Sequence, residues 1–389
     1  MNVNAAATVG VGRRWVIKCV TPLVVAGTML ACSSGPEKPK PAELSTNVAL
    51  VNARLAWSAR LGSVNFPLDI AVNSRSNVLS ITAAGSDGVV ASFDASNGRE
   101  LWRSNIGAAI AAGVGSDGVL ASVITNANEI VTMEGGRVLW RQKLNASSYT
   151  APLVAGGRVF VLSSDRSVTA FDGQSGRKLW SQKRTNEALV LRQSGVLLAV
   201  DDTLVVGLSG RLVGMNPLDG SVRWETPLAT ARGTNDVERL VDLVGRVSRE
   251  GSVVCARSFR VSVGCVNADR GTLLWTKPAS GSEGVHGDER AVFGVESDGR
   301  VIAWNRINGE RLWSTERLQY RSLTAPVVVG RSVAIGDSTG LVHLLSRKDG
   351  SPLTRLSTDG SAVATTPILA GNTLVVVTRN GGIYGFLPE

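Results

Sequence analysis

The chain has 389 residues, of which 43 are glycine, 5% are aromatic and 19% are charged, and its formal net charge is +9. Removing residues 1–31, which hold three basic and no acidic residues, would leave +6. This small excess is not gathered into dense Lys/Arg runs, so the composition argues against a nucleic-acid-binding protein. The many glycines and the scarcity of helix-period stretches favour a turn-rich β fold.

The first 31 residues have the pattern of an export signal. Basic residues precede an apolar run, Val20–Ala31, which is too short to span a bilayer and matches the h-region of a signal peptide. The run leads directly into Cys32, and this ending resembles the bacterial lipoprotein signal, in which the cysteine is acylated. Ser33 follows, which in lipoproteins generally implies sorting to the outer membrane. We therefore predict lipidation at Cys32 and an anchor in the outer membrane facing the periplasm; the alternative is ordinary signal cleavage nearby.

Residues 32–47 are polar and rich in proline, which predicts a flexible tether. The folded domain is then expected over residues 48–389. It opens with a lone strand that ends at Trp57.

A phrase of nine residues then returns seven times. A short polar residue is followed four positions later by Gly and four further on by Trp, and the turn glycines lie 38 to 51 residues apart. Five copies are complete and two are partial: Asp94–Gly98–Trp102, Asp172–Gly176–Trp180, Asn216–Gly220–Trp224, Asn267–Gly271–Trp275, Asn305–Gly309–Trp313, then Gly136–Trp140 and Ser346–Gly350–Thr354. A period near forty indicates one small all-β unit repeated in a fold that closes on itself.

Each copy predicts four antiparallel strands with a tight Asx–Gly turn before the last one. The recurring Trp is interpreted as packing between neighbouring units, because a buried indole removes about 150–250 Å² from water. After Thr354 the sequence predicts three more strands without a fourth. The lone strand before Trp57 can complete that last sheet, which predicts an eight-bladed β-propeller of four-stranded blades, closed by pairing the N-terminal strand with the C-terminal blade.

Cys255 and Cys265 lie in a predicted hairpin whose exact turn the sequence leaves open. A turn centred on Arg260 places the two thiols opposite each other, whereas a two-residue turn at Arg260–Val261 puts them on opposite faces of the sheet. A disulfide and two free thiols are therefore both possible. A metal site is not expected, since two cysteines without a nearby histidine are a poor zinc set.

Two segments depart from the repeat without a packing reason. In Glu187–Arg192 a Leu-x-Leu-Arg sequence replaces a simple strand entry, and Gly233–Arg246 supplies the extra residues of the longest repeat. Apolar anchors flanked by charges are typical of protein-binding patches. The candidate partner-binding residues are Leu189, Leu191, Arg192, Arg239, Leu240 and Asp242. The alternative is a pair of solvated loops with ordinary core leucines.

Nothing in the chain indicates catalysis. The two histidines, His286 and His343, are far apart, and no HExxH, GxSxG, P-loop or CxxC motif occurs. No catalytic residue and no cofactor are therefore predicted.

The repeated phrase resembles the PQQ-type β-propeller repeat. The lipoprotein signal, the eight copies, the segments Leu189–Arg192 and Gly233–Asp242, and the stretch Tyr320–Leu345 further resemble the BamB family of outer-membrane protein assembly factors. This resemblance covers essentially the whole mature chain.

The resemblance implies a non-catalytic periplasmic scaffold lipoprotein of the machinery that folds and inserts outer-membrane β-barrel proteins. Its partners would be the soluble domains of the central barrel subunit and unfolded outer-membrane clients; nucleic acid is not among them. The family docks through Leu-x-Leu-Arg and an Asp-x-Asp pair, which fall here on Leu189, Leu191, Arg192 and Asp242. Val244 stands in place of the second acid.

Two alternatives come from other functional classes. One is a quinoprotein dehydrogenase of the same superfamily, whose members are longer and carry a vicinal cysteine pair that this chain lacks. The other is a cell-envelope propeller that binds a different ligand.

Replacing Cys32 with serine should release the protein into the periplasm in soluble form, because the acyl chains that hold it to the membrane could not be attached. Fractionation of cell envelopes measures this. Unaltered membrane association of Cys32→Ser would contradict lipidation at this residue.

Overall fold

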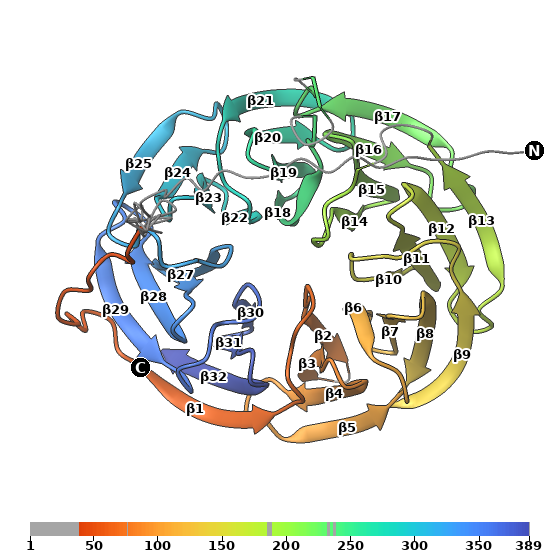
Figure 1. Ribbon diagram of the computed structural model, residues 1–389, viewed down its shortest axis with the longest axis horizontal. Coiled ribbons are helices and arrows are strands. Elements are labelled where there is room, and N and C mark those ends of the chain that lie inside the picture. The colour runs from red at the N-terminus through yellow and green to blue at the C-terminus, as the bar shows by residue number, and fades with distance from the viewer. Residues whose placement is uncertain (1–38, 76, 185–188, 232–233, 236–238, 389) are drawn as a thin grey trace, which may run out of the picture. The chain divides into compact units, whose positions relative to one another are not determined.

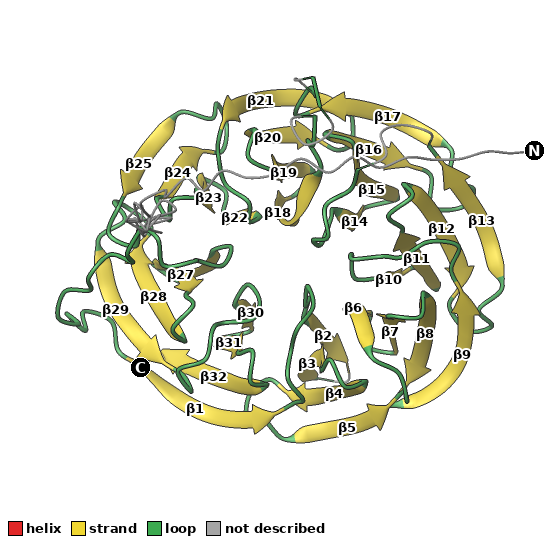
Figure 2. Cartoon of the chain, viewed as in Figure 1, coloured by secondary structure: helices red, strands yellow, loops and turns green. Residues whose placement is uncertain are grey.

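The computed structural model describes residues 39–388 except for 76, 185–188, 232–233 and 236–238. The described residues form 32 strands in eight four-stranded antiparallel sheets, and Figure 2 shows only strands and connecting loops. The described part of the chain contains no helix long and apolar enough to cross a bilayer. Residues 40–388 form one unit, a ring of sheets around a central axis (Figure 1).

We number the blades 1 to 8 along the chain. The strands of blades 1 to 4 are β2 (Ala71–Arg75), β3 (Val78–Ala84), β4 (Val89–Asp94), β5 (Glu100–Asn105); β6 (Ile110–Ser116), β7 (Leu120–Thr125), β8 (Glu129–Glu134), β9 (Arg137–Lys143); β10 (Leu153–Ala155), β11 (Arg158–Leu162), β12 (Ser167–Asp172), β13 (Lys178–Lys183); β14 (Leu197–Val200), β15 (Thr203–Leu208), β16 (Arg211–Met215) and β17 (Val222–Pro227).

The strands of blades 5 to 8 are β18 (Leu243–Glu250), β19 (Val253–Ser258), β20 (Ser262–Asn267), β21 (Thr272–Pro278); β22 (Val285–Gly287), β23 (Ala291–Val295), β24 (Val301–Asn305), β25 (Arg311–Thr315); β26 (Val327–Val329), β27 (Ser332–Gly336), β28 (Leu341–Ser346), β29 (Pro352–Ser357); β30 (Ile368–Ala370), β31 (Thr373–Val377), β32 (Gly382–Pro388) and β1 (Ala53–Arg60).

Blade 8 closes the ring with both ends of the domain. Its sheet order is β1-β32-β31-β30, and β1 pairs with β32 from Ala53↔Pro388 to Arg60↔Gly382 (Figure 1). The eight-bladed propeller and its closure by the N-terminal strand, both predicted from the sequence, are confirmed. Closure leaves no incomplete sheet and ties the two ends of the domain together.

The antiparallel order gives the ring two different faces. The turns between the first and second and between the third and fourth strands of each blade lie on one face, which we call the turn face. The turns between the second and third strands lie on the other, together with the links from the outer strand of one blade to the inner strand of the next. We call this second face the connection face.

At five junctions between blades, the repeated Trp bonds the turn of the next blade. The indole of Trp180 in blade 3 donates a hydrogen bond to the carbonyl of Pro217, 3.1 Å away in the Asx–Gly turn of blade 4. Gly220 of that turn has φ +77°, and a Cβ there would come within 2.6 Å of the Trp180 ring. Only glycine therefore allows the positive φ and the close approach of the ring. Equivalent bonds are Trp57–Ala95, Trp140–Gly173, Trp275–Arg306 and Trp313–Arg347.

The junction of blades 7 and 8 lacks the Trp because it lacks the turn that would receive it. In blade 8 the third and fourth strands are β32 and β1, so chain ends stand where the other blades have an Asx–Gly turn. Thr354 occupies the Trp position and lies opposite Leu344, whereas Trp180 lies opposite Ala170 and Trp313 opposite Ala303. At the junction of blades 7 and 8, therefore, the small Thr354 lies opposite the large Leu344, whereas at the other two junctions a large indole lies opposite an alanine.

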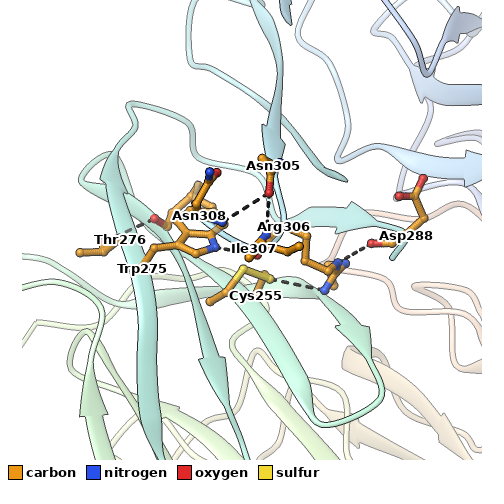
Figure 3. The surroundings of a disulfide bond; sticks show 11 residues. Cys255, Trp275, Thr276, Asp288, Asn305, Arg306, Ile307 and Asn308 are labelled. Carbon is orange, nitrogen blue, oxygen red and sulfur yellow. Dashed lines mark hydrogen bonds between the residues drawn. A yellow bond between two sulfur atoms is a disulfide. The ribbon is translucent and has the colours of Figure 1, made fainter. Parts of the chain in front are cut away.

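The cysteine pair lies inside blade 5. Cys255 on β19 stands directly opposite Cys265 on β20, Arg260 takes a φ of +55° in the turn, and the two sulfurs are bonded. The structure thus has the first of the two registers that the sequence left open. Arg306 of blade 6 reaches this site: its Nη1 donates to Cys255 Sγ at 3.5 Å, and its Nε donates to the carbonyl of Asp288 (Figure 3).

Part of the predicted tether is hydrogen-bonded to the propeller. The Ala42 amide donates to the Gln319 carbonyl at 2.9 Å, and the Leu50 amide donates to the Leu353 carbonyl at 2.7 Å. Between them the Asn47 side chain accepts from the Arg355 amide at 3.0 Å and donates to the Arg355 carbonyl at 3.3 Å, as a paired strand residue would. Residues 42–50 therefore cover the outer edge of β29 and block it from pairing with another strand.

Substituting Trp180 with alanine should lower the free energy of unfolding by about 3–5 kcal/mol, because it empties a buried indole site between two blades. Denaturant unfolding measures the loss. Leu218→Ala is the matched control, since Leu218 is 63% exposed on the neighbouring turn, and its substitution should change stability little. A Trp180→Ala protein as stable as the control would contradict the packing role.

Candidate functional site

The predicted Leu-x-Leu-Arg segment lies in the link between blades 3 and 4, on the connection face. Leu189 is 40% exposed, Arg192 is exposed, and Leu191 is half-buried. The segment is not a strand in the structure. The exposed side chains of Leu189 and Arg192 form the accessible part of this loop, and the two residues between them are half-buried. We call Leu189–Arg192 the docking loop.

Two charged residues from different blades hold the docking loop in place. Arg166 Nη1 contacts Asp242 Oδ1 at 2.7 Å, and Arg166 Nη2 donates to the carbonyl of Leu189 at 3.1 Å. Asp242 Oδ2 accepts from the amide of Leu191 at 3.0 Å. The ion pair thus binds the loop backbone on both sides of residue 190. We call Arg166 and Asp242 the clamp.

The clamp is buried beneath the loop. Arg166 is 5% exposed and Asp242 is 8% exposed. Arg166 comes from the turn between β11 and β12, and Asp242 ends the link between blades 4 and 5, where its carbonyl accepts from the amide of Phe259 at 2.9 Å. A buried, charge-assisted arrangement of this kind fixes geometry more than it adds stability.

The clamp changes the role expected for Asp242. The sequence placed this acid on the partner-binding surface, but its carboxylate is directed to Arg166 and to the backbone of the docking loop. The position of the family's second acid is Val244, which is 1% exposed, pairs with Arg257 on β19 and forms a bridge to Gly195. Valine at this position therefore removes no charge from the surface.

The remaining candidates lie beside the clamp. Arg239 is exposed and Leu240 is half-buried, and the amide of Arg239 donates to the carbonyl of Asn235 at 3.2 Å. Other parts of the predicted segment, residues 232–233 and 236–238, lie outside the described residues. Among the described residues, the departures from the repeat at 189–192 and 239–242 come together on one part of the connection face.

The docking loop borders a hollow on the connection face. The guanidinium of Arg192 lies over the ring of Tyr149, 5.8 Å from its centre. Tyr149, Arg192, Gln193 and Ser194 line a cavity of about 870 Å³ that opens on the connection face. We call this cavity the axial cup.

Sequence reasoning missed Arg166 and Tyr149. One signal for Arg166 was present: it occupies the left-handed position of its turn, with φ +61°, where blades 1, 6 and 7 place Gly88, Gly299 and Gly340. An arginine where the fold favours glycine indicates a side chain kept for its contacts. Tyr149 carries no comparable signal.

The two histidines of the chain lie outside the docking loop and the clamp, and their surroundings indicate structural roles. His343 is 2% exposed, and its Nε2 lies 3.0 Å from Asp337 Oδ2, which Arg321 also contacts. Burial lowers the pKa of His286 to about 4, with the nearby cations Arg246 and Arg306 acting in the same direction. Within the described residues, no group of three His, Cys, Asp or Glu side chains is placed to hold a metal ion.

Comparison with known proteins places the chain in a family. Residues 86–315 match the family described as "Outer membrane protein assembly factor BamB". The chain belongs to the BamB family. It is 36% identical over 378 residues to the outer membrane protein assembly factor BamB of Burkholderia pseudomallei, covering 95% of this chain and 98% of that protein. The corresponding protein of Bordetella pertussis is 34% identical and covers 96% of this chain and 97% of its own length.

Solved structures agree with this assignment. The crystal structure of BamB from Moraxella catarrhalis superposes with a TM-score of 0.78 at 25% identity, covering 86% of this chain and 100% of that one. The quinohemoprotein alcohol dehydrogenase of Comamonas testosteroni has a TM-score of 0.65 at 13% identity, covering 88% of this chain and 77% of that chain. The second likeness is one of fold alone.

Substituting Asp242 with alanine should lower the free energy of unfolding by about 1–3 kcal/mol, because the buried Arg166 loses its paired carboxylate and the Leu191 amide loses its acceptor. Hydrogen exchange should show faster exchange of the Leu191 amide. The double variant Arg166→Met/Asp242→Leu should regain stability but not the slow exchange. Unchanged exchange at Leu191 in Asp242→Ala would contradict the clamp.

Proposed function

We propose that this protein is a non-catalytic scaffold lipoprotein of the outer-membrane β-barrel assembly machinery. It docks through the docking loop on the soluble domains of the central barrel subunit and so assists the folding and insertion of outer-membrane proteins. The clamp is the observation that carries this proposal. Arg166 and Asp242 are buried and bind the loop backbone, while the side chains of Leu189 and Arg192 remain exposed.

A loop held in this way is suited to binding a partner. Ordering an interface side chain or loop on association costs about 0.5–1.5 kcal/mol for each immobilised side chain. The clamp fixes the backbone of the docking loop before the partner arrives, so this part of the cost is not met on binding. Leu189 offers an apolar anchor, and Arg192 offers a planar guanidinium already stacked on Tyr149.

The anchor belongs to the same proposal. Cys32 lies outside the described residues, and we propose that it is acylated in the outer membrane, with residues 33–41 spanning the distance to the propeller. Nine residues reach at most about 30–32 Å when extended. Within the folded unit, the Ala42 amide donates to the Gln319 carbonyl in the link between blades 6 and 7, on the connection face.

The alternative of a quinoprotein dehydrogenase rests on the propeller fold alone. The chain is only 13% identical in sequence to the quinohemoprotein alcohol dehydrogenase of Comamonas testosteroni. The four cysteines of the chain include no adjacent pair. Adding PQQ with calcium tests this alternative directly. Tight binding together with reduction of an artificial electron acceptor would overturn the scaffold proposal.

Leu189→Ala and Arg192→Ala should each weaken binding to the soluble domains of the central barrel subunit by about 1–3 kcal/mol, with the free energy of unfolding unchanged. Titration calorimetry on the purified mature protein measures the affinity. Leu218→Ala removes a more exposed leucine from the turn face and should leave binding intact. Equal loss in all three variants, or a large loss of stability in the first two, would count against the docking loop.

A further inference from the structure

The axial cup carries more positive charge than its own carboxylates neutralise. Three arginines line it from three directions: Arg192 from the link between blades 3 and 4, Arg246 from β18, and Arg379 from the turn between β31 and β32. Asp69 and Glu283 are the acidic residues that line it. The cup is therefore an electropositive hollow next to the docking loop.

The three arginines differ in the contacts that they already make with other groups of the protein. Arg246 Nη1 donates to the carbonyl of Pro367 at 3.3 Å, and Arg246 and Asp69 attract each other. Arg192 stacks on Tyr149. In the described part of the chain, neither Arg192 nor Arg379 forms an ion pair with a carboxylate, and both side chains are exposed. Two guanidinium groups thus face the cup with their donors open to a ligand.

The two acids of the cup are both affected by burial. Burial raises the pKa of Asp69, whose Oδ2 accepts a hydrogen bond from Ser194 Oγ at 2.9 Å. Burial also raises the pKa of Glu283. Both shifts mean that burial disfavours the charged form of these two acids.

From this geometry we propose that the axial cup receives an acidic loop of the docking partner, whose carboxylates face the arginines Arg192, Arg246 and Arg379 that line the cup. The inference rests on the proposed function, because it places the tip of the same partner beside the docking loop. It adds Arg379 and Arg246 to the binding surface. Neither residue is among the candidate partner-binding residues predicted from the sequence.

The size and position of the cup fit this occupant. A volume of about 870 Å³ lies within the range of about 300–1,000 Å³ typical of protein pockets that enclose a ligand. The cup is continuous with the docking loop through Arg192, Gln193 and Ser194, so one partner surface can contact both. Guanidinium groups bind carboxylates through paired N–H donors, which gives the site a preferred ligand chemistry.

The test compares charge variants against the soluble domains of the central barrel subunit. Arg379→Gln should weaken binding about two- to fivefold and reduce the dependence of the affinity on salt, because an exposed ion pair is lost. Arg246→Gln should act in the same direction, with its melting temperature recorded alongside. Arg270→Gln, an exposed arginine on the turn face of blade 5, is the matched control and should change neither quantity.

A second arm uses two synthetic hairpin peptides that differ only in carrying Asp and Glu or Asn and Gln at the turn. The acidic peptide should bind the intact mature protein, and Arg379→Gln should weaken that binding; the amide peptide should not bind. Sodium phosphate at the same ionic strength as sodium chloride should not compete better than the chloride. Stronger competition by phosphate would make the cup a small-anion site and overturn the acidic loop.

The two proposals fail in different ways. If Leu189→Ala weakens partner binding while Arg379→Gln and Arg246→Gln bind like the control, the docking function stands and the occupied cup is wrong. If the wild-type protein does not bind the soluble domains at all, the proposed function fails, and the peptide pair alone decides the cup. Equal binding of the acidic and amide peptides would overturn the cup in either case.

Discussion

The contact between a tryptophan of one blade and the glycine turn of the next is the constraint on which the rest of this structure depends. Each four-stranded sheet is too small to bury its own apolar faces, and it is stable only when a neighbour covers them. The indole covers that boundary and also fixes the distance and tilt between blades, because its N–H bonds the turn carbonyl while the ring lies on the turn glycine, as at Trp180 and Gly220. Repetition of this contact makes a ring in which the connection face keeps one shape.

That fixed shape is what makes the docking loop useful. Arg166 and Asp242 belong to segments of different blades, yet they meet at 2.7 Å and bind the same short backbone segment. Such a clamp works only if the blades do not shift against each other. The stiffness supplied by the tryptophans and the exposure of Leu189 and Arg192 are therefore parts of one arrangement, in which the ring contributes position rather than chemistry.

Most of the fold could be predicted from the sequence because each blade carries a copy of the same repeated phrase. Spacing of the Asx–Gly–Trp phrase revealed the blades, and the three strands after Thr354 together with the lone strand before Trp57 revealed the closure. The site was predicted less completely. The two departing segments were found, but the direction of the Asp242 carboxylate depends on Arg166, which is 76 residues away in the chain. A contact between blades has no local pattern, so sequence alone could not assign it.

Other details depended on choices that a single sequence does not resolve. The register of the Cys255 hairpin depends on which turn residue takes a positive φ, and the structure gives this to Arg260. The tether was predicted from composition, and composition does not reveal that Asn47 can imitate a strand residue at the edge of β29. Both cases show a side chain or turn whose conformation is decided by a neighbour rather than by its own segment.

The most direct measurement is site-specific photocrosslinking in intact cells, with a photoreactive residue placed at position 192 in one variant and at position 218 in another. Our account predicts that position 192 captures the central barrel subunit of the assembly machinery and that position 218, on the turn face, does not. Capture of that subunit at 218 but not at 192 would contradict the claim that the connection face is the working surface of the ring.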